Sequence, residues 1–283
     1  MSTMPRIAVT GSTGAVGGQV ARGLAARGIE QRLLVRTLDR APQLERAVVL
    51  PISYADRELA LRALDGVQVL FMVSAKEAPD RLEQHRTFID AAAEAGVEQL
   101  VYTSFYGAAP DCTFTFGRDH DATEQHIRSR GLGHTFLRDN FYLDLLPSFV
   151  GEDGVIRGPS GDGRVAAVAR EDVARVATEV LADPAGHRDL TYNLTGPQAL
   201  SMSEVAAVIT ERTGRQVSFH NETVPEAYQS RKRWPAADWE YDAWVSTYTA
   251  IAAGELAGVT DDVERVTGQP PLGLAEYLDR ARG

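Results

Sequence analysis

Three glycines near the start of the chain are spaced so that a backbone loop could hold a diphosphate. They follow an apolar run and precede an amphipathic segment. A glycine at a strand end permits a tight turn, a second lets the backbone approach a pyrophosphate, and a third lets helix and strand pack closely. N–H groups at the start of the helix would face the phosphates. This context favours a dinucleotide site over a purely structural turn. The expected contacts are Thr10, Gly11, Thr13, Gly14, Ala15, Val16 and Gly17.

Arg36 follows the second expected strand, where the ribose of a bound nucleotide is recognised. Sites that prefer NAD commonly carry an acidic residue there, which binds the ribose 2′-hydroxyl. This chain has Arg36 instead, after Val35. A guanidinium can bind a 2′-phosphate through two hydrogen bonds and can stack on adenine. The sequence therefore predicts NADP(H) in preference to NAD(H), the alternative being that Arg36 is only a solvated surface residue.

Other side chains that could do chemistry lack the spacing for it. Asp111, Asp119 and Asp121 do not form a metal-ligand pattern, so no metal is expected. Ser12 and Ser104 have no His/Asp arrangement that would make either one a nucleophile. The expected chemistry therefore depends on a bound nucleotide.

Alternating strands and helices are expected to position these residues. Apolar runs predict strands at 6–10, 31–35, 48–52, 68–73, 99–103 and 134–138, and helical patterns fall at 17–27, 57–64, 79–95 and 120–130. This alternation predicts βαβ units and a parallel sheet. The expected fold class is α/β, a Rossmann-type doubly wound parallel sheet with a smaller C-terminal α/β lobe. Sheets of this kind bind ligands at the carboxyl ends of their strands.

The pattern changes after about residue 145. Residues 151–163 are rich in glycine and are expected to be loops. Short strands follow at 165–168 and 190–194, with helices at 171–181 and 203–213 and a mainly helical tail from 225. We therefore expect an NAD(P)-binding domain over residues 1–150. A smaller, mostly helical substrate lobe packed on that core is expected over residues 151–283.

Composition limits the possible partners. The 283 residues carry a formal net charge of −10, which argues against a surface that binds nucleic acid nonspecifically. No apolar run approaches the roughly 18 residues needed to span a bilayer, and the N-terminus lacks a secretory signal. We expect a cytoplasmic protein, monomeric or homodimeric, that acts on a small-molecule acceptor without nucleic-acid or membrane partners.

The chain resembles a known family over about residues 5–280. Besides the glycine loop, the resemblance rests on motifs at 35–36, 69–74, 85–97, 102–104, 135–142, 170–174 and 267–271. It looks like an atypical short-chain dehydrogenase/reductase of the NmrA-like group, and within that group it resembles bacterial NAD(P)H:quinone oxidoreductase-like proteins. The resemblance is specific for fold and cofactor and much less specific for substrate.

The resemblance implies further cofactor contacts after three strands. One set follows the fourth strand and should line the adenosine-ribose and pyrophosphate side, a second ends the fifth strand near the nicotinamide, and a third ends the sixth, where nicotinamide and substrate should meet. These sets are Val73, Ser74 and Ala75, then Tyr102, Thr103 and Ser104, then Asn140, Phe141 and Tyr142.

The resemblance also suggests where a catalytic group would lie. Ordinary short-chain dehydrogenases use a Tyr-x-x-x-Lys pair, which this chain lacks, since its only lysines are Lys76 and Lys232. Related isoflavone-reductase-like enzymes carry a lysine 15 residues before the threonine that corresponds to Thr135. In this chain that position is His120, as in the quinone-reductase-like proteins. A histidine of ordinary pKa could donate a proton at neutral pH. His120 and Tyr102 are thus the expected catalytic residues, although His120 could instead bind only the nicotinamide ribose or cap its helix.

These expectations combine into an NADPH-dependent reductase that transfers hydride to a quinone-like or other conjugated small molecule. Two alternatives remain open. One is a non-catalytic NAD(P)-binding redox sensor or regulator of the NmrA type, with which the missing Tyr-x-x-x-Lys pair is compatible. The weaker one is an isomerase or epimerase that keeps its cofactor bound.

Overall fold

The computed structural model describes residues 4–281 and is organised around a seven-stranded sheet. The strand order is β3-β2-β1-β4-β5-β6-β9, and the pairs β1–β2, β2–β3, β1–β4 and β4–β5 are parallel. The strands are β1 (Ile7–Thr10), β2 (Gln31–Val35), β3 (Ala47–Pro51), β4 (Val69–Met72), β5 (Gln99–Phe105), β6 (Gly133–Asp139) and β9 (Leu190–Leu194). The predicted doubly wound Rossmann-type fold is confirmed.

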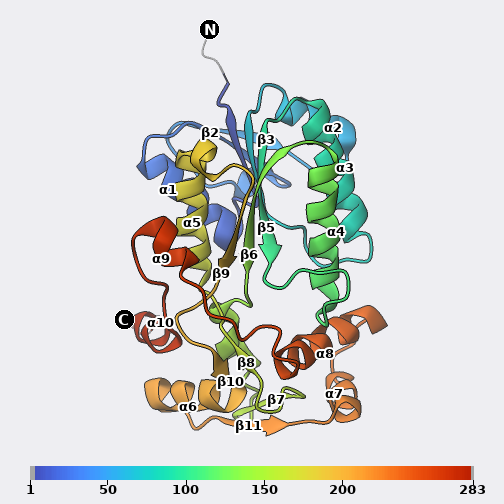
Figure 1. Ribbon diagram of the computed structural model, residues 1–283, viewed down its shortest axis with the longest axis vertical. Helices are drawn as coiled ribbons and strands as arrows, with labels where there is room; N and C mark the ends of the chain where they lie inside the picture. Colours follow the sequence, from blue (N-terminus) through green and yellow to red (C-terminus); the bar gives the residue numbers. More distant parts are fainter. Residues whose placement is uncertain (1–3, 282–283) are drawn as a thin grey trace. The chain divides into compact units, whose positions relative to one another are not determined.

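Helices cover both faces of this sheet, as Figure 1 shows. Helices α1 (Ala15–Ala26) and α5 (Arg170–Ala182) pack together on one face, and α2 (Arg57–Leu64), α3 (Arg81–Glu94) and α4 (Thr115–Ser129) cover the other. The strands can be apolar on both sides because neither side meets water, and Leu70, Phe71 and Met72 of β4 are fully buried. The chain changes direction at β1, whose neighbours are β2 and β4, so a ligand crevice is expected at the carboxyl end of β1.

Contacts divide the chain into two units that are not continuous in sequence. The first runs to Ser104 and adds Asp119–Arg138 and Arg170–Tyr192, while the second consists of Phe105–Arg118, Asp139–Ala169 and the described chain from Asn193 onward. Each unit has its own cluster of buried apolar side chains.

The second unit contains short strands as well as helices. Its strands are β7 (Val155–Gly158), β8 (Arg164–Val165), β10 (Leu200–Ser201) and β11 (Ser218–Asn221), and its helices are α6 (Met202–Thr213), α7 (Val224–Arg231), α8 (Asp238–Ala252), α9 (Asp262–Thr267) and α10 (Leu274–Arg280). The helical tail is confirmed. The expectation of loops throughout 151–163 is wrong, because β7 lies there and pairs in parallel with β11.

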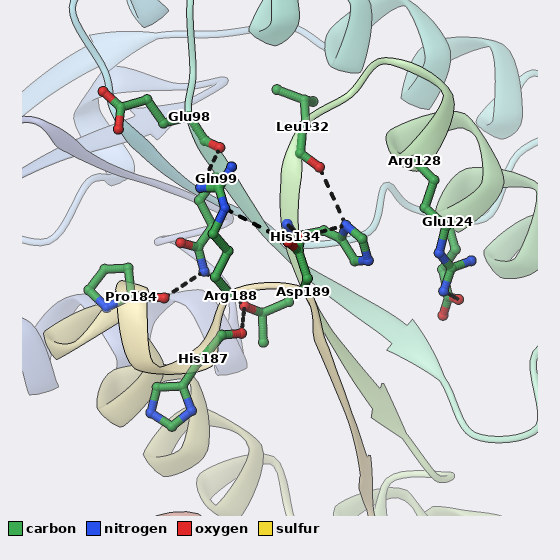
Figure 2. Close-up of polar contacts among 11 residues, drawn as sticks. Glu98, Gln99, Glu124, Arg128, Leu132, His134, Pro184, His187, Arg188 and Asp189 are labelled. Atoms are coloured by element: carbon green, nitrogen blue, oxygen red, sulfur yellow. Dashed lines mark hydrogen bonds and ion pairs between the residues drawn. The ribbon is translucent and has the colours of Figure 1, made fainter.

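A polar cluster ties together the amino ends of β5 and β6, as Figure 2 shows. The Gln99 amide donates to the Thr135 hydroxyl at 3.0 Å and to the Pro184 carbonyl at 2.9 Å. The Thr135 hydroxyl in turn donates to the His187 carbonyl at 2.8 Å. These bonds attach the short helix η3 (Pro184–His187) to the sheet. They lie at the amino ends of the strands, opposite to the end where ligands are expected.

Candidate functional site

The glycine loop leaves no room for side chains where the chain turns into α1. Gly11 adopts a φ of +64°, which favours glycine. A Cβ atom on Gly17 would lie 2.5 Å from the Gly11 carbonyl oxygen, a backbone atom that cannot easily move aside. The Gly14 N–H donates to that same carbonyl at 2.9 Å. The first glycine is therefore favoured by its positive φ and the third is required by the close approach of backbone.

The start of α1 suits an anionic group. Its N-cap, Gly14, provides no side-chain hydrogen bond, and the first turn of α1 carries no acidic residue. The first helical hydrogen bond runs from the Gly18 N–H to the Gly14 carbonyl. The N–H groups before Gly18 therefore have no partner inside the helix. Thr13, Gly14 and Ala15 are exposed, whereas the side chain of Val16 is buried. The arrangement fits the pyrophosphate of a dinucleotide.

Arg36 lies just past the carboxyl end of β2, which is the neighbour of β1. Thr10 at the end of β1 pairs with Leu34 of β2, and the Arg36 side chain is exposed two residues further on. Packing around the Tyr54 phenol raises its pKa above the ordinary value, and the nearby positive charge of Arg36 acts in the opposite direction. Arg36 is thus within electrostatic reach of the residues that border the glycine loop.

The backbone that follows β4 is fixed by side chains from neighbouring elements. The N–H of Val73 donates to the Thr10 hydroxyl at 2.9 Å, and the hydroxyl of Tyr54 lies 2.7 Å from both the Val73 carbonyl and the Thr10 hydroxyl. The N–H of Ser74 donates to the Thr103 hydroxyl at 2.8 Å. Thr10, Val73, Ser74 and Thr103, all expected from the sequence, are therefore brought together.

Ala75, the next residue of this loop, is held by the buried His85 of α3. The Ala75 N–H donates to Nε2 of His85 at 2.8 Å, so this ring nitrogen must be unprotonated. The proton of the neutral ring is then on Nδ1, 2.9 Å from the Thr123 hydroxyl, which donates to the Asp119 carbonyl at 2.7 Å. Burial, reinforced by the charge of Arg81, lowers the pKa of His85 to about 3.

His120 and Tyr102, the two expected catalytic residues, also lie together. Nδ1 of His120 is 2.9 Å from the Tyr102 hydroxyl, and a guanidinium nitrogen of Arg81 donates to His120 Nε2 at 3.0 Å. Burial, together with the charges of Arg81 and His85, holds the pKa of His120 well below its ordinary value. The premise of a histidine with ordinary pKa is therefore wrong, because His120 is neutral at pH 7. Burial likewise raises the pKa of Tyr102, whose side chain is fully buried.

Ser104 belongs to a different buried contact. Its hydroxyl donates to Glu124 at 2.6 Å, and Arg138 forms two hydrogen bonds of 2.8 and 2.7 Å with the same carboxylate. Because Glu124 is fully buried, its charge needs this paired partner. Ser104 thus helps to satisfy an ion pair between α4 and β6.

Asn140, Phe141 and Tyr142 belong to the second unit. The Asn140 amide donates to the Leu256 carbonyl at 3.0 Å and its oxygen accepts the Phe141 N–H at 2.8 Å. The Tyr142 hydroxyl donates to Asp139 at 3.0 Å, and burial raises the pKa of that carboxyl well above its ordinary value. Asn140 therefore shapes the turn after β6, and the predicted nicotinamide contacts of these residues stay predictions.

Sequence reasoning missed two of the residues that organise this site. It gave neither His85 nor Arg81 a role in this site, yet both are buried. A signal was present, because the two lie four residues apart on the helix face that also carries Phe88 and Ala92. Polar side chains on an apolar face are expected to have buried partners.

No helix within residues 4–281 combines the length and the apolar character needed to span a membrane.

Residues 3–234 of the chain match the model of the NmrA-like family. The chain is 33% identical over 276 residues to an NAD(P)H azoreductase of Xenophilus azovorans, with 96% of each chain covered. It is 30% identical over 280 residues to quinone oxidoreductase 2 of Escherichia coli strain K12, covering 96% of this chain and 97% of the relative. The solved structure of an NADPH-dependent quinone oxidoreductase from E. coli, complexed with NADPH, superimposes with a TM-score of 0.89 at 29% identity, covering 98% of this chain and 100% of the other. The expected resemblance and the expected enzyme class, an NAD(P)H-dependent oxidoreductase, are confirmed.

Proposed function

This chain belongs to the NmrA-like family, and from that premise we propose that it is an NADPH-dependent reductase that transfers hydride to a quinone-like or other conjugated small molecule. The observation that carries the proposal is the glycine loop, where a Cβ on Gly17 would meet backbone and where the first turn of α1 has no acidic side chain. The reductases to which the chain is similar over nearly its whole length support the choice of activity.

The residues of the chain would hold the nucleotide and orient it. The loop at 11–17 would bind the pyrophosphate through backbone N–H groups, and Arg36 would bind the 2′-phosphate. The fixed backbone at 73–75 would line the adenosine-ribose and pyrophosphate side. When bound, the nicotinamide supplies the hydride.

Protonation of the product does not require a charged histidine. His120 is neutral at pH 7, and its Nε2 accepts a hydrogen bond from Arg81. A quinone accepts hydride readily, and water can protonate the reduced oxygen afterwards. Most of the rate would then come from holding donor and acceptor together.

Turnover is tested by mixing the purified protein with NADPH and a small panel of quinones, and following the absorbance of the reduced nicotinamide. We expect oxidation of NADPH well above the protein-free blank. Micromolar binding of NADPH without any oxidation across the panel would overturn the reductase proposal and favour the alternative, a redox sensor that binds NAD(P) without turnover.

The preference for NADPH is tested with Arg36→Glu, since a carboxylate there repels the 2′-phosphate. We expect NADPH to bind at least about tenfold more weakly, because charge-assisted hydrogen bonds contribute about 1.5–3 kcal/mol. NADH binding should change little. Arg62→Glu, on the exposed surface of α2, controls for the change in net charge. Equal losses for NADPH and NADH would contradict the role of Arg36.

A further inference from the structure

We infer that Arg81 is a positioning residue that joins the backbone at 73–75 to the buried His120–Tyr102 pair. Its guanidinium donates through Nε to the Ala75 carbonyl at 3.0 Å and through a terminal nitrogen to Nε2 of His120 at 3.0 Å. The side chain is only 3% exposed, so these bonds are made away from water. The inference rests on the proposed function, which places the nucleotide beside residues 73–75.

Arg81 determines which nitrogen of His120 carries the proton. A guanidinium can only donate, so Nε2 of His120 must accept and the ring proton must be on Nδ1. That proton is directed at the Tyr102 hydroxyl, 2.9 Å away. The Ala75 N–H imposes the same arrangement on His85, whose Nε2 accepts and whose Nδ1 donates to Thr123. The two buried imidazoles therefore share one protonation pattern.

Burial keeps both rings neutral, and the positive charge of Arg81 adds to this effect. The charged and titratable groups around the His120–Tyr102 pair include Arg81 and His85 on α3, Tyr102 on β5, and Asp119 and Glu124 on α4. The carboxylate of Glu124 is already paired with Arg138. Asp119 pairs with Arg81 at 3.5 Å and remains 30% exposed on its side chain, so it compensates the guanidinium only in part. A second proton on either ring would be repelled by the buried Arg81 cation. It would also remove the Nε2 lone pair that accepts from the Ala75 N–H in His85 and from Arg81 in His120.

The consequence is a backbone segment whose geometry does not respond to pH in the neutral range. Ala75 is held from both sides, since its N–H is bound by His85 and its carbonyl by Arg81. If Arg81 is lost, the Ala75 carbonyl loses its hydrogen-bond donor. The pKa of His85 and that of His120 should then rise, because the nearby positive charge is gone. The segment should then loosen progressively as the pH drops.

The test compares Arg81→Met, which removes the cation, with Arg81→Lys, which keeps it but cannot bridge in the same geometry. Arg86→Met on the exposed side of α3 is the matched control. Dissociation constants for NADPH are measured from pH 8 to pH 5 and divided by the wild-type value at each pH. This ratio cancels the titration of the 2′-phosphate itself, which has a pKa near 6.

For Arg81→Met we expect NADPH binding at least about tenfold weaker at pH 8, with a ratio that grows further as the pH falls to 5. For Arg81→Lys we expect weaker binding with a ratio that stays constant. For Arg86→Met the ratio should be near one throughout. A constant ratio in Arg81→Met, or one that matches the control, would overturn the inference.

A measurement on the wild-type protein covers the case in which Arg81→Met does not fold. Nitrogen NMR of the histidine rings, assigned with His85→Gln and His120→Gln, should find both rings protonated on Nδ1 and unchanged between pH 8 and pH 5. A ring that titrates in this range, or one protonated on Nε2, would refute the inference. Neither readout requires turnover, so a protein that fails the quinone assay but gives these results would lose the proposed activity and keep the role of Arg81.

Discussion

At the scale of single residues, the most consequential feature is a pair of imidazoles that the fold keeps uncharged. Burial and the charge of Arg81 lower the pKa of His85 to about 3 and hold that of His120 well below its ordinary value. In the unfolded chain both rings have a pKa of about 6.5. Below that pH the unfolded state binds more protons than the folded state, so acid favours unfolding.

We therefore predict that the free energy of unfolding falls as the pH drops from 8 to 5. The stability that His85 contributes is fully present above its unfolded pKa, and at pH 5 about 2 kcal/mol of it is lost. His85→Gln has no titrating ring and should show a shallower dependence by about that amount. Urea unfolding at several pH values measures the pH dependence of the unfolding free energy for the wild type and for His85→Gln. The titration of carboxylates contributes equally to both, so the difference reports on His85. Identical slopes would mean that His85 titrates normally in the folded protein.

The glycine loop could be predicted from the sequence, because Gly11, Gly14 and Gly17 act locally, within one strand–helix junction. The helix face of Arg81 signalled that the residue is buried, but its contacts with Asp119 and His120 could not be predicted, because those partners lie on α4. The pKa of His120 was inaccessible for the same reason, since it depends on charges that only folding brings near. The residues of the site were therefore predictable where a backbone motif or the family resemblance marks them, whereas the side-chain contacts and pKa shifts that arise between elements were not.

At the scale of elements, the same distinction separates the strands that were expected from those that were missed. Strand β4 was predicted because it is a continuous apolar run between βα units. Strand β7 was not, because it is four residues long, lies in a glycine-rich segment and pairs with β11 about 60 residues later. Helix α4 starts at Thr115, five residues before the expected start at His120, so the alternative in which His120 caps its helix is wrong.

We predict that the polar cluster at the amino ends of β5 and β6 contributes to the stability of the protein but not to NADPH binding. Thr135→Val keeps the shape of the side chain but removes the hydroxyl that Gln99 and the His187 carbonyl share. We expect a loss of about 1–3 kcal/mol in unfolding free energy, because buried polar groups are left unsatisfied. NADPH affinity should not change, since this cluster lies at the opposite end of the strands from the glycine loop. Chemical denaturation measures the change in unfolding free energy, and a binding titration measures NADPH affinity. Thr87→Val on α3 is the control. A change in affinity would show that the two ends of the sheet are coupled.

At the scale of the whole molecule, the chain forms two units with separate apolar clusters. The second unit contains a buried ion pair, in which Arg231 donates to Glu222 at 3.0 Å and also lies over the Tyr248 ring. The expected substrate lobe over residues 151–283 stays a prediction.

We predict that Glu222→Ala destabilises the protein by about 3–5 kcal/mol, because the buried Arg231 charge would lose its partner. If the first unit alone holds the nucleotide, the dissociation constant for NADPH should remain at the wild-type value under conditions where the variant is folded. Glu211→Ala, an exposed site on α6, is the control. Weaker NADPH binding in Glu222→Ala, with Glu211→Ala unaffected, would show that the second unit contributes to nucleotide affinity.

The interleaving of the two units has a consequence for synthesis. The first unit draws on three separate stretches of chain, the last of which ends at Tyr192, and β9 at the edge of its sheet begins only at Leu190. A growing polypeptide therefore has its glycine loop long before β9 is synthesised and completes the sheet. Until then the outer edge of β6 has no neighbouring strand. A chaperone that shields strand edges would be expected to engage the nascent chain during that interval.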